Sequence, residues 1–110
     1  KNDIYVAEEV REKAAADNIL LKGAPIPKGM IVEISMVAII DETTSGKTAR
    51  IGYERAGFQY WIKQEPASTN YHGIEYSGTL YLVEDECPIG MVESATLNDT
   101  IRFFARGKYL

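Results

Sequence analysis

Short apolar runs that alternate with polar residues, separated by polar turns, predict a mainly β protein. Six to eight such segments recur at spacings of about 8–14 residues, which is typical of an antiparallel β-sandwich of the jelly-roll type. The chain has 110 residues, is 45% hydrophobic and carries one cysteine, so we expect a cored domain without an internal disulfide. A short N-terminal helix or extended arm over residues 1–22 is expected to precede a sandwich domain over residues 23–110.

The N-terminal segment differs from the rest of the chain in composition. Val6–Asp17 lacks Gly, Pro and Thr and is rich in Ala, Glu, Arg and Lys, which favour a helix. Its apolar face is thin and consists chiefly of Val6, Val10 and Ala14, so a helix here needs another surface to pack against. The alternative is an extended arm that becomes ordered only on assembly.

The strongest predicted strand is Met30–Ile40, which follows the extended, proline-rich segment Pro25–Gly29. A polar turn over Asp41–Lys47 is predicted to connect it to a strand over Thr48–Tyr53, which makes a hairpin. Alternation predicts that one apolar face of the first strand is made by Val32, Ile34, Met36, Ala38 and Ile40.

The remaining strands are predicted over Phe58–Lys63, Gly78–Glu84, Met91–Ala95 and Thr100–Arg106, with an exposed loop over residues 64–73. In the first of them Phe58, Tyr60 and Ile62 are expected to face inward, and Trp61 lies on the other, polar face. The residues predicted to be mostly buried are Val32, Ile34, Met36, Ile51, Leu80, Leu82, Ile101 and Phe103.

Composition argues against several classes of function. The net charge of −4 disfavours a protein that binds nucleic acid by neutralising phosphates. The longest apolar run, Met36–Ile40, is far shorter than the roughly 20 residues that span a bilayer. A single histidine, with no acid and base at a recognisable spacing, predicts no enzyme, no catalytic residues, no cofactor and no metal site.

Three polar features have plain structural interpretations. The acidic run Glu84–Glu86 lacks the spacing of a calcium loop and is expected to be a solvated turn. Cys87 has acidic neighbours, which disfavour a reactive thiolate, so a small buried side chain is expected. His72 is expected to be exposed in a loop, with a pH-responsive contact as the alternative.

Aromatic residues gather around the central loop and include Tyr60, Trp61, Tyr71 and Tyr76. An outward tryptophan beside tyrosines can stack on a sugar ring or anchor a protein interface. A carbohydrate-binding β-sandwich module that uses Trp61, Tyr60 and Tyr71 is therefore one hypothesis. Packing of both strand faces is the structural alternative.

Several strand-and-turn segments, over about two thirds of the chain, together form a familiar pattern. They are Ile26–Gly29, Ser45-Gly46, Ala49–Tyr53, Thr79–Val83, Asn98–Phe104 and Gly107–Leu110. The pattern resembles small β-sandwich virion proteins of tailed bacteriophages, of the head-decoration or capsid-accessory type. The resemblance implies a non-enzymatic structural protein of the virion, assembled in the host cytoplasm, that decorates or stabilises the head.

We therefore expect a protein that self-associates and binds the major capsid protein or another virion protein. A homo-oligomer, and specifically a trimer, is expected, with no nucleic-acid or membrane partner. The contact residues are expected to be Trp61 and Tyr71 near the central loop, together with Ile4, Tyr5 and Val10 in the N-terminal segment.

Overall fold

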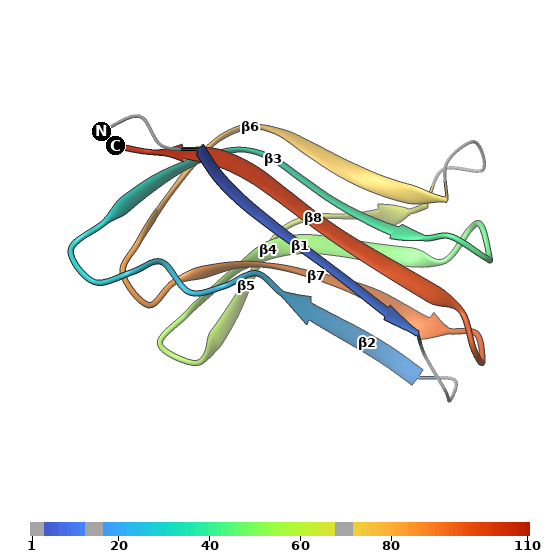
Figure 1. Cartoon of the computed structure of the whole chain (residues 1–110). Helices are drawn as coiled ribbons and strands as arrows, with labels where there is room; N and C mark the ends of the chain where they lie inside the picture. Colours follow the sequence, from blue (N-terminus) through green and yellow to red (C-terminus); the bar gives the residue numbers. More distant parts are fainter. Residues whose placement is uncertain (1–3, 13–16, 68–71) are drawn as a thin grey trace.

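The computed structural model describes residues 4–12, 17–67 and 72–110, and for residues 9–12 it describes the backbone only. Two four-stranded sheets face each other to form a sandwich (Figure 1). The described residues form strands and no helix, and accordingly they include no helix that could cross a membrane. The strands are β1 (Ile4–Glu12), β2 (Asp17–Lys22), β3 (Ile31–Asp41), β4 (Thr48–Arg55), β5 (Phe58–Pro66), β6 (Gly73–Val83), β7 (Cys87–Ala95) and β8 (Thr100–Tyr109).

The strand order identifies a jelly roll. The first sheet has the order β1-β8-β3-β6 and the second sheet the order β2-β7-β4-β5. All neighbouring strands are antiparallel. The first strand pairs with the last, the second with the seventh, the third with the sixth and the fourth with the fifth, as in a long hairpin rolled into two sheets. The predicted fold class, an antiparallel jelly-roll-like sandwich, is confirmed.

The predicted N-terminal helix is wrong. Ile4–Glu12 forms β1 and pairs in register with β8 along its whole length. Tyr5 and Ala7 are buried whereas their neighbours are exposed, which is the period of a strand. Local helix propensity is overridden because pairing with β8 and burial of these two side chains reward the extended form. Residues 13–16 of the predicted helix lie outside the described residues.

An extra residue in β3 changes which side chains face the core. From Ile34 to Met36 β3 advances by two residues while β8 advances by one, so Ser35 is an extra residue of β3 and forms a β-bulge against β8. At the same place β6 advances by three residues, from Leu80 to Ser77, so the extra residue of that pair is on β6. The fully buried residues are Val32 and Ile34 before the bulge and Val37 and Ile39 after it. The predicted inward face is therefore wrong beyond Ser35, and Met36 and Ile40 are only half-buried.

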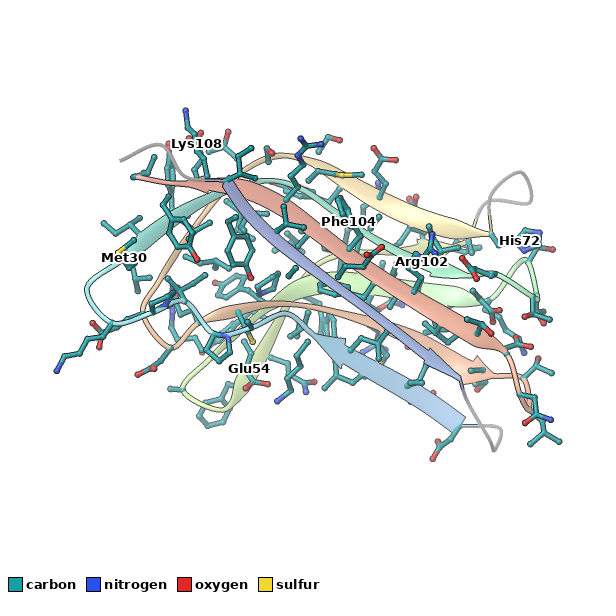
Figure 2. All side chains as sticks on the ribbon, viewed as in Figure 1. Met30, Glu54, His72, Arg102, Phe104 and Lys108 are labelled. Atoms are coloured by element: carbon teal, nitrogen blue, oxygen red, sulfur yellow. The ribbon has the colours of Figure 1, made fainter. Side chains whose placement is uncertain are left out.

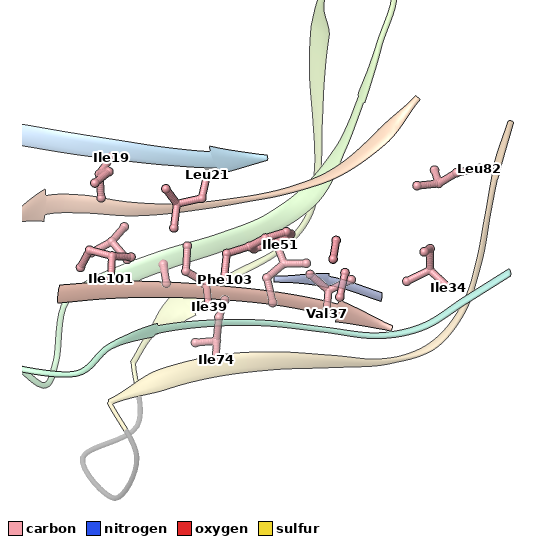
Figure 3. Packing of buried hydrophobic residues seen from close by; sticks show 14 of the residues in the cluster. Ile19, Leu21, Ile34, Val37, Ile39, Ile51, Ile74, Leu82, Ile101 and Phe103 are labelled. Carbon is pink, nitrogen blue, oxygen red and sulfur yellow. The ribbon is translucent and has the colours of Figure 1, made fainter. Parts of the chain in front are cut away.

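The core lies between the sheets and draws on both (Figure 3). Six of the eight predicted core residues are fully buried: Val32, Ile34, Ile51, Leu82, Ile101 and Phe103. The other two, Met36 and Leu80, are half-buried. Period-two patterning thus predicts most of the core correctly.

The two strands of the predicted hairpin are confirmed, since β3 ends at Asp41 and β4 begins at Thr48. The hairpin itself is wrong, because β3 and β4 belong to different sheets and the turn between them crosses from one sheet to the other. The later strands are longer than predicted. In particular, β5 extends to Pro66 and β6 begins at Gly73, which shortens the expected central loop. Residues 68–71 of that loop lie outside the described residues.

Candidate interaction surfaces

Exposed large apolar side chains gather mainly on two surfaces. The outer-face patch lies on the side of the first sheet that faces away from the second sheet, and it consists of Ile4, Val6, Ile31, Tyr81, Val83 and Leu110. The β5 stripe lies on an edge strand of the second sheet and consists of Phe58, Tyr60 and Ile62. Leu97, in the turn between β7 and β8, completes the exposed large apolar side chains of the described part of the chain.

Strand register brings the outer-face patch together at one end of the sandwich. One row across the first sheet runs through Ile4, Lys108, Glu33 and Tyr81. In the next row on the same face of the sheet Ile31 lies opposite Val83. The Leu110 N–H donates to the carbonyl of Ile31 at 2.9 Å. Figure 2 shows Lys108 at this end, where the chain reaches its C-terminus, and His72 at the opposite end.

The centre of the patch is polar and hollowed. An open groove of about 340 Å³ is lined by Ile4, Glu33, Ser35, Arg106, Gly107 and Lys108. The Lys108 ammonium lies 3.7 Å from the Glu33 carboxylate, and the hydroxyl of the bulged Ser35 donates to the Arg106 carbonyl at 3.1 Å. The groove therefore combines an apolar rim with charged groups of both signs.

The β5 stripe contains a second β-bulge. The pairing of β4 with β5 shifts between Ile51 and Gly52, so Ile62 is the extra residue. Tyr60 lies opposite Tyr53, and the two rings stack with centroids 5.2 Å apart. The Arg55 guanidinium lies 5.3 Å from the centroid of the Tyr53 ring, which orders the hairpin further.

The register agrees with the predicted side of β5 for Phe58 and Tyr60, because they lie opposite Arg55 and Tyr53 and Tyr53 packs against the core. These two side chains and Ile62 are nevertheless exposed. Phe58 is 67% exposed, Tyr60 44% and Ile62 39%. The physical reason is their position, because β5 is an edge strand of its sheet and the bulge at Ile62 interrupts its alternation.

Trp61 lies on the opposite side of β5 from Tyr60 and is half-buried. The guanidinium carbon of Arg50 lies 5.8 Å from the centroid of the indole, and Arg50 also forms an ion pair with Glu93. Pairing across the second sheet produces a row of Lys22, Ile89, Gly52 and Trp61. Ile89 is fully buried in this row although it is not part of the core cluster. A Cβ atom on Gly52 would collide with the backbone of Tyr60 and Trp61, so β4 and β5 approach closely beside the bulge.

The structure does not bring the predicted contact residues together. Ile4 belongs to the outer-face patch on the first sheet, whereas Trp61 lies on the outer side of the second sheet. Tyr5 is 4% exposed, its hydroxyl donates to the Ala24 carbonyl at 3.2 Å, and its ring meets Tyr109 edge-on, so its side chain is not available to a partner. The side chain of Val10 and the whole of Tyr71 lie outside the described residues.

The acidic turn and Cys87 have structural roles. Glu86 was expected to be solvated, but it is buried, pairs with Arg55 and accepts the Val83 N–H at 2.9 Å. Cys87 is buried as expected, and its pKa is raised first by burial and then by the negative charge of Glu54. The described residues include no group of three or more His, Cys, Asp or Glu side chains placed to hold a metal ion.

The fold and these surfaces define a jelly-roll sandwich with two exposed apolar regions. No protein-family model matches the chain, and no curated protein matches it significantly. One similar solved structure is the nucleoplasmin-like N-terminal domain of Drosophila FKBP39, with a TM-score of 0.44 and 9% identity over 97% of this chain and 89% of that chain. Another is dimeric latent PorU from Porphyromonas gingivalis, with a TM-score of 0.32 and 11% identity over 96% of this chain and 13% of that chain. Similarities this distant give no information about function.

Proposed function

We propose that this chain is a non-enzymatic structural virion protein that self-associates and binds the capsid surface, where it decorates or stabilises the head. The virion assignment rests on the resemblance of its strand-and-turn segments to small phage virion proteins. The observation that supports self-association most is the outer-face patch, with six exposed large apolar side chains at one end of one sheet.

Such a patch favours assembly for a simple physical reason. Each square ångström of apolar surface removed from water contributes about 25 cal/mol, so a partner that covers the exposed apolar side chains of the patch stabilises the assembly. Arg106, Lys108 and Glu33 line the groove within the patch and offer specific polar contacts to the partner. A second copy of the chain is the occupant that we propose.

The presence of two apolar surfaces supports a ring. A head-to-tail contact uses two different surfaces of each copy and closes when the rotation between copies allows it. The outer-face patch of one copy packs on the β5 stripe of the next, and three copies complete the proposed trimer. Each trimer then presents several equivalent contacts to the repetitive capsid surface, so weak individual contacts add up through avidity.

Co-sedimentation tests the capsid part of the proposal. The purified chain is mixed with particles assembled from the major capsid protein of the same genome, and bound chain is quantified in the pellet. We expect a fixed number of copies per particle that saturates with concentration. Binding should persist in Leu97→Glu, an exposed change outside both apolar surfaces. A wild-type chain that stays in the supernatant at saturating concentration contradicts the proposal.

The carbohydrate-binding alternative loses support from the arrangement of the aromatic residues. Tyr60 and Trp61 lie on opposite sides of β5, so they do not form one platform for a sugar ring. Arg50 is stacked near the Trp61 ring. A glycan array provides the direct test, and specific sugar binding that Trp61→Ala abolishes would restore the alternative.

A further inference from the structure

Two aspartates are buried at the end of the sandwich opposite the outer-face patch. Asp41 is the last residue of β3 and Asp99 lies in the turn between β7 and β8, and each is 1% exposed. Backbone hydrogen bonds join the segments around them. The Glu42 N–H donates to the Thr100 carbonyl at 3.0 Å, and the Asp41 N–H donates to the carbonyl of His72, also at 3.0 Å. His72 marks this end of the molecule in Figure 2.

Each of the two carboxyl groups has an oxygen without a partner. Oδ1 of Asp41 accepts the N–H groups of Thr43 and Thr44 at 3.1 and 3.0 Å. Oδ2 of Asp41 and Oδ2 of Asp99 are buried and have no hydrogen-bond partner within the described residues. Strand pairing brings the two residues close together, because Asp41 lies opposite Ile101, two residues after Asp99, and the Glu42 N–H bonds to Thr100 between them. Unpartnered buried carboxylate oxygens are costly, so two of them at one place in the fold call for a shared partner.

No positively charged side chain neutralises the pair. No ion pair formed by the described residues includes either aspartate, since Arg102 pairs with Glu42 and Glu8 and the Lys47 ammonium donates to the Ser94 carbonyl. The other titratable groups from the elements at this end are exposed or half-buried: Asp17, Glu42, Lys47, Glu65, His72, Glu93 and Arg102. Two carboxylates this close cannot both be ionised in a buried site at low cost.

We propose that Asp41 and Asp99 share one proton in the folded protein, and that this proton is a pH-sensitive latch between the β3–β4 turn and the β7–β8 turn. One carboxyl group is the acid and donates its O–H to the other, which is the carboxylate. A single proton thereby satisfies both unpartnered Oδ2 atoms. When the proton is released to solvent, two buried negative charges face each other and drive the two turns apart.

The direction of the Asp41 titration agrees with the geometry. Burial raises the pKa of Asp41, the hydrogen bond with Asp99 raises it further, and the N–H groups of Thr44 and Thr43 oppose the rise. An aspartate in the unfolded chain loses its proton at about pH 3.9. The stabilisation from the pair is therefore complete below that pH and is lost as the pH rises through the higher folded pKa.

Equilibrium unfolding in urea between pH 4 and pH 8, roughly the range in which carboxyl groups and their shifted forms titrate, tests the latch. A single proton held only by the folded state raises the unfolding constant by up to about tenfold per pH unit. Asp99→Asn replaces the shared proton with an amide N–H that donates to Asp41 at every pH. We expect its unfolding constant to rise less steeply with pH than that of the wild type. Asp17→Asn, an exposed change, should keep the wild-type slope.

Parallel pH profiles for the wild type and Asp99→Asn overturn the proposal. A midpoint that millimolar CaCl₂ raises in the wild type but not in Asp99→Asn also overturns it, because a bound cation would then bridge the two carboxylates. Carboxyl ¹³C NMR of the wild type gives a reading that does not depend on a variant folding. Two coupled aspartate resonances are expected, with that of Asp41 titrating above the usual range, and ordinary midpoints for all aspartates contradict the shared proton.

Discussion

Gly107 of β8 lies opposite Ile34 of β3, where β3 carries its extra residue, and a Cβ atom on Gly107 would lie 2.1 Å from the carbonyl oxygen of Glu33. The backbones of the two strands approach too closely here for any side chain on β8. The same bulge changes which side chains of β3 face inward, and its Ser35 lines the outer-face groove together with Gly107. One local irregularity thus links the core to the candidate interface.

Gly107→Ala should destabilise the fold, because the added methyl group meets backbone that cannot move without disturbing the sheet. We expect the free energy of unfolding in urea to fall by at least about 1–3 kcal/mol. Lys108→Ala is the matched control, since it removes only a partly exposed ion pair worth about 0–1 kcal/mol. A loss in Gly107→Ala no larger than that of the control contradicts the close approach.

Val37→Ala and Met36→Ala test the side-chain orientation that the bulge imposes. Val37 is fully buried and should lose roughly 2 kcal/mol of unfolding free energy. Met36 is half-buried on the outer side and should lose less than about 1 kcal/mol. Uninterrupted alternation through β3 predicts the reverse order, so denaturant curves of the two variants separate the two registers.

Ile34→Ala should cost about 2–5 kcal/mol because it leaves a cavity between the sheets. Ile31→Ala removes the same atoms from a position exposed in the single chain, and it should change the stability of the dissociated chain, measured at low protein concentration, by less than about 0.5 kcal/mol. Thermal or urea unfolding of both variants gives the comparison. Equal effects on the two sites would be inconsistent with the sandwich described above.

Tyr5 makes stability fall at high pH. Burial, and then the proximity of Tyr109 and Cys87, raise the pKa of Tyr5 from 10.0 to about 12. The stabilisation from protonated Tyr5 is complete below the pKa of tyrosine in the unfolded chain and is lost as the pH rises through the folded pKa. The loss of unfolding free energy amounts to about 2–3 kcal/mol. The check is urea unfolding at about pH 9.5 and about pH 11.5, on either side of the tyrosine titration. Between these two pH values the free energy of unfolding should fall less in Tyr5→Phe than in the wild type.

Much of the sandwich can be predicted from the sequence because its strands are bounded by strong turns. Asp41–Lys47 has too many polar groups for the core, so the break between β3 and β4 follows directly. A local pattern does not show that the chain crosses to the other sheet at this turn. The bulge cannot be predicted in this way. After Ser35 both sides of β3 are apolar, and the alternation fits Met36 inward as well as Val37 inward.

Non-local contacts explain the other differences. The composition of Val6–Asp17 favours a helix locally, but the register with β8 is invisible to a local pattern. The same limit applies to the surfaces. Alternation places Tyr81 and Val83 on one side of a strand but does not reveal whether another layer covers that side. Asp41 and Asp99 each look like an ordinary turn residue until the fold brings them together.

Sedimentation velocity at increasing protein concentration tests the central claim, self-association through the outer-face patch and the β5 stripe. The wild type should approach the mass of three chains. Ile31→Glu and Phe58→Glu should each shift it to the mass of one chain, because each places a charge in one half of the same head-to-tail contact. Leu97→Glu should keep the wild-type mass. A wild type that remains monomeric at high concentration, or an assembly unaffected by Ile31→Glu, contradicts the account.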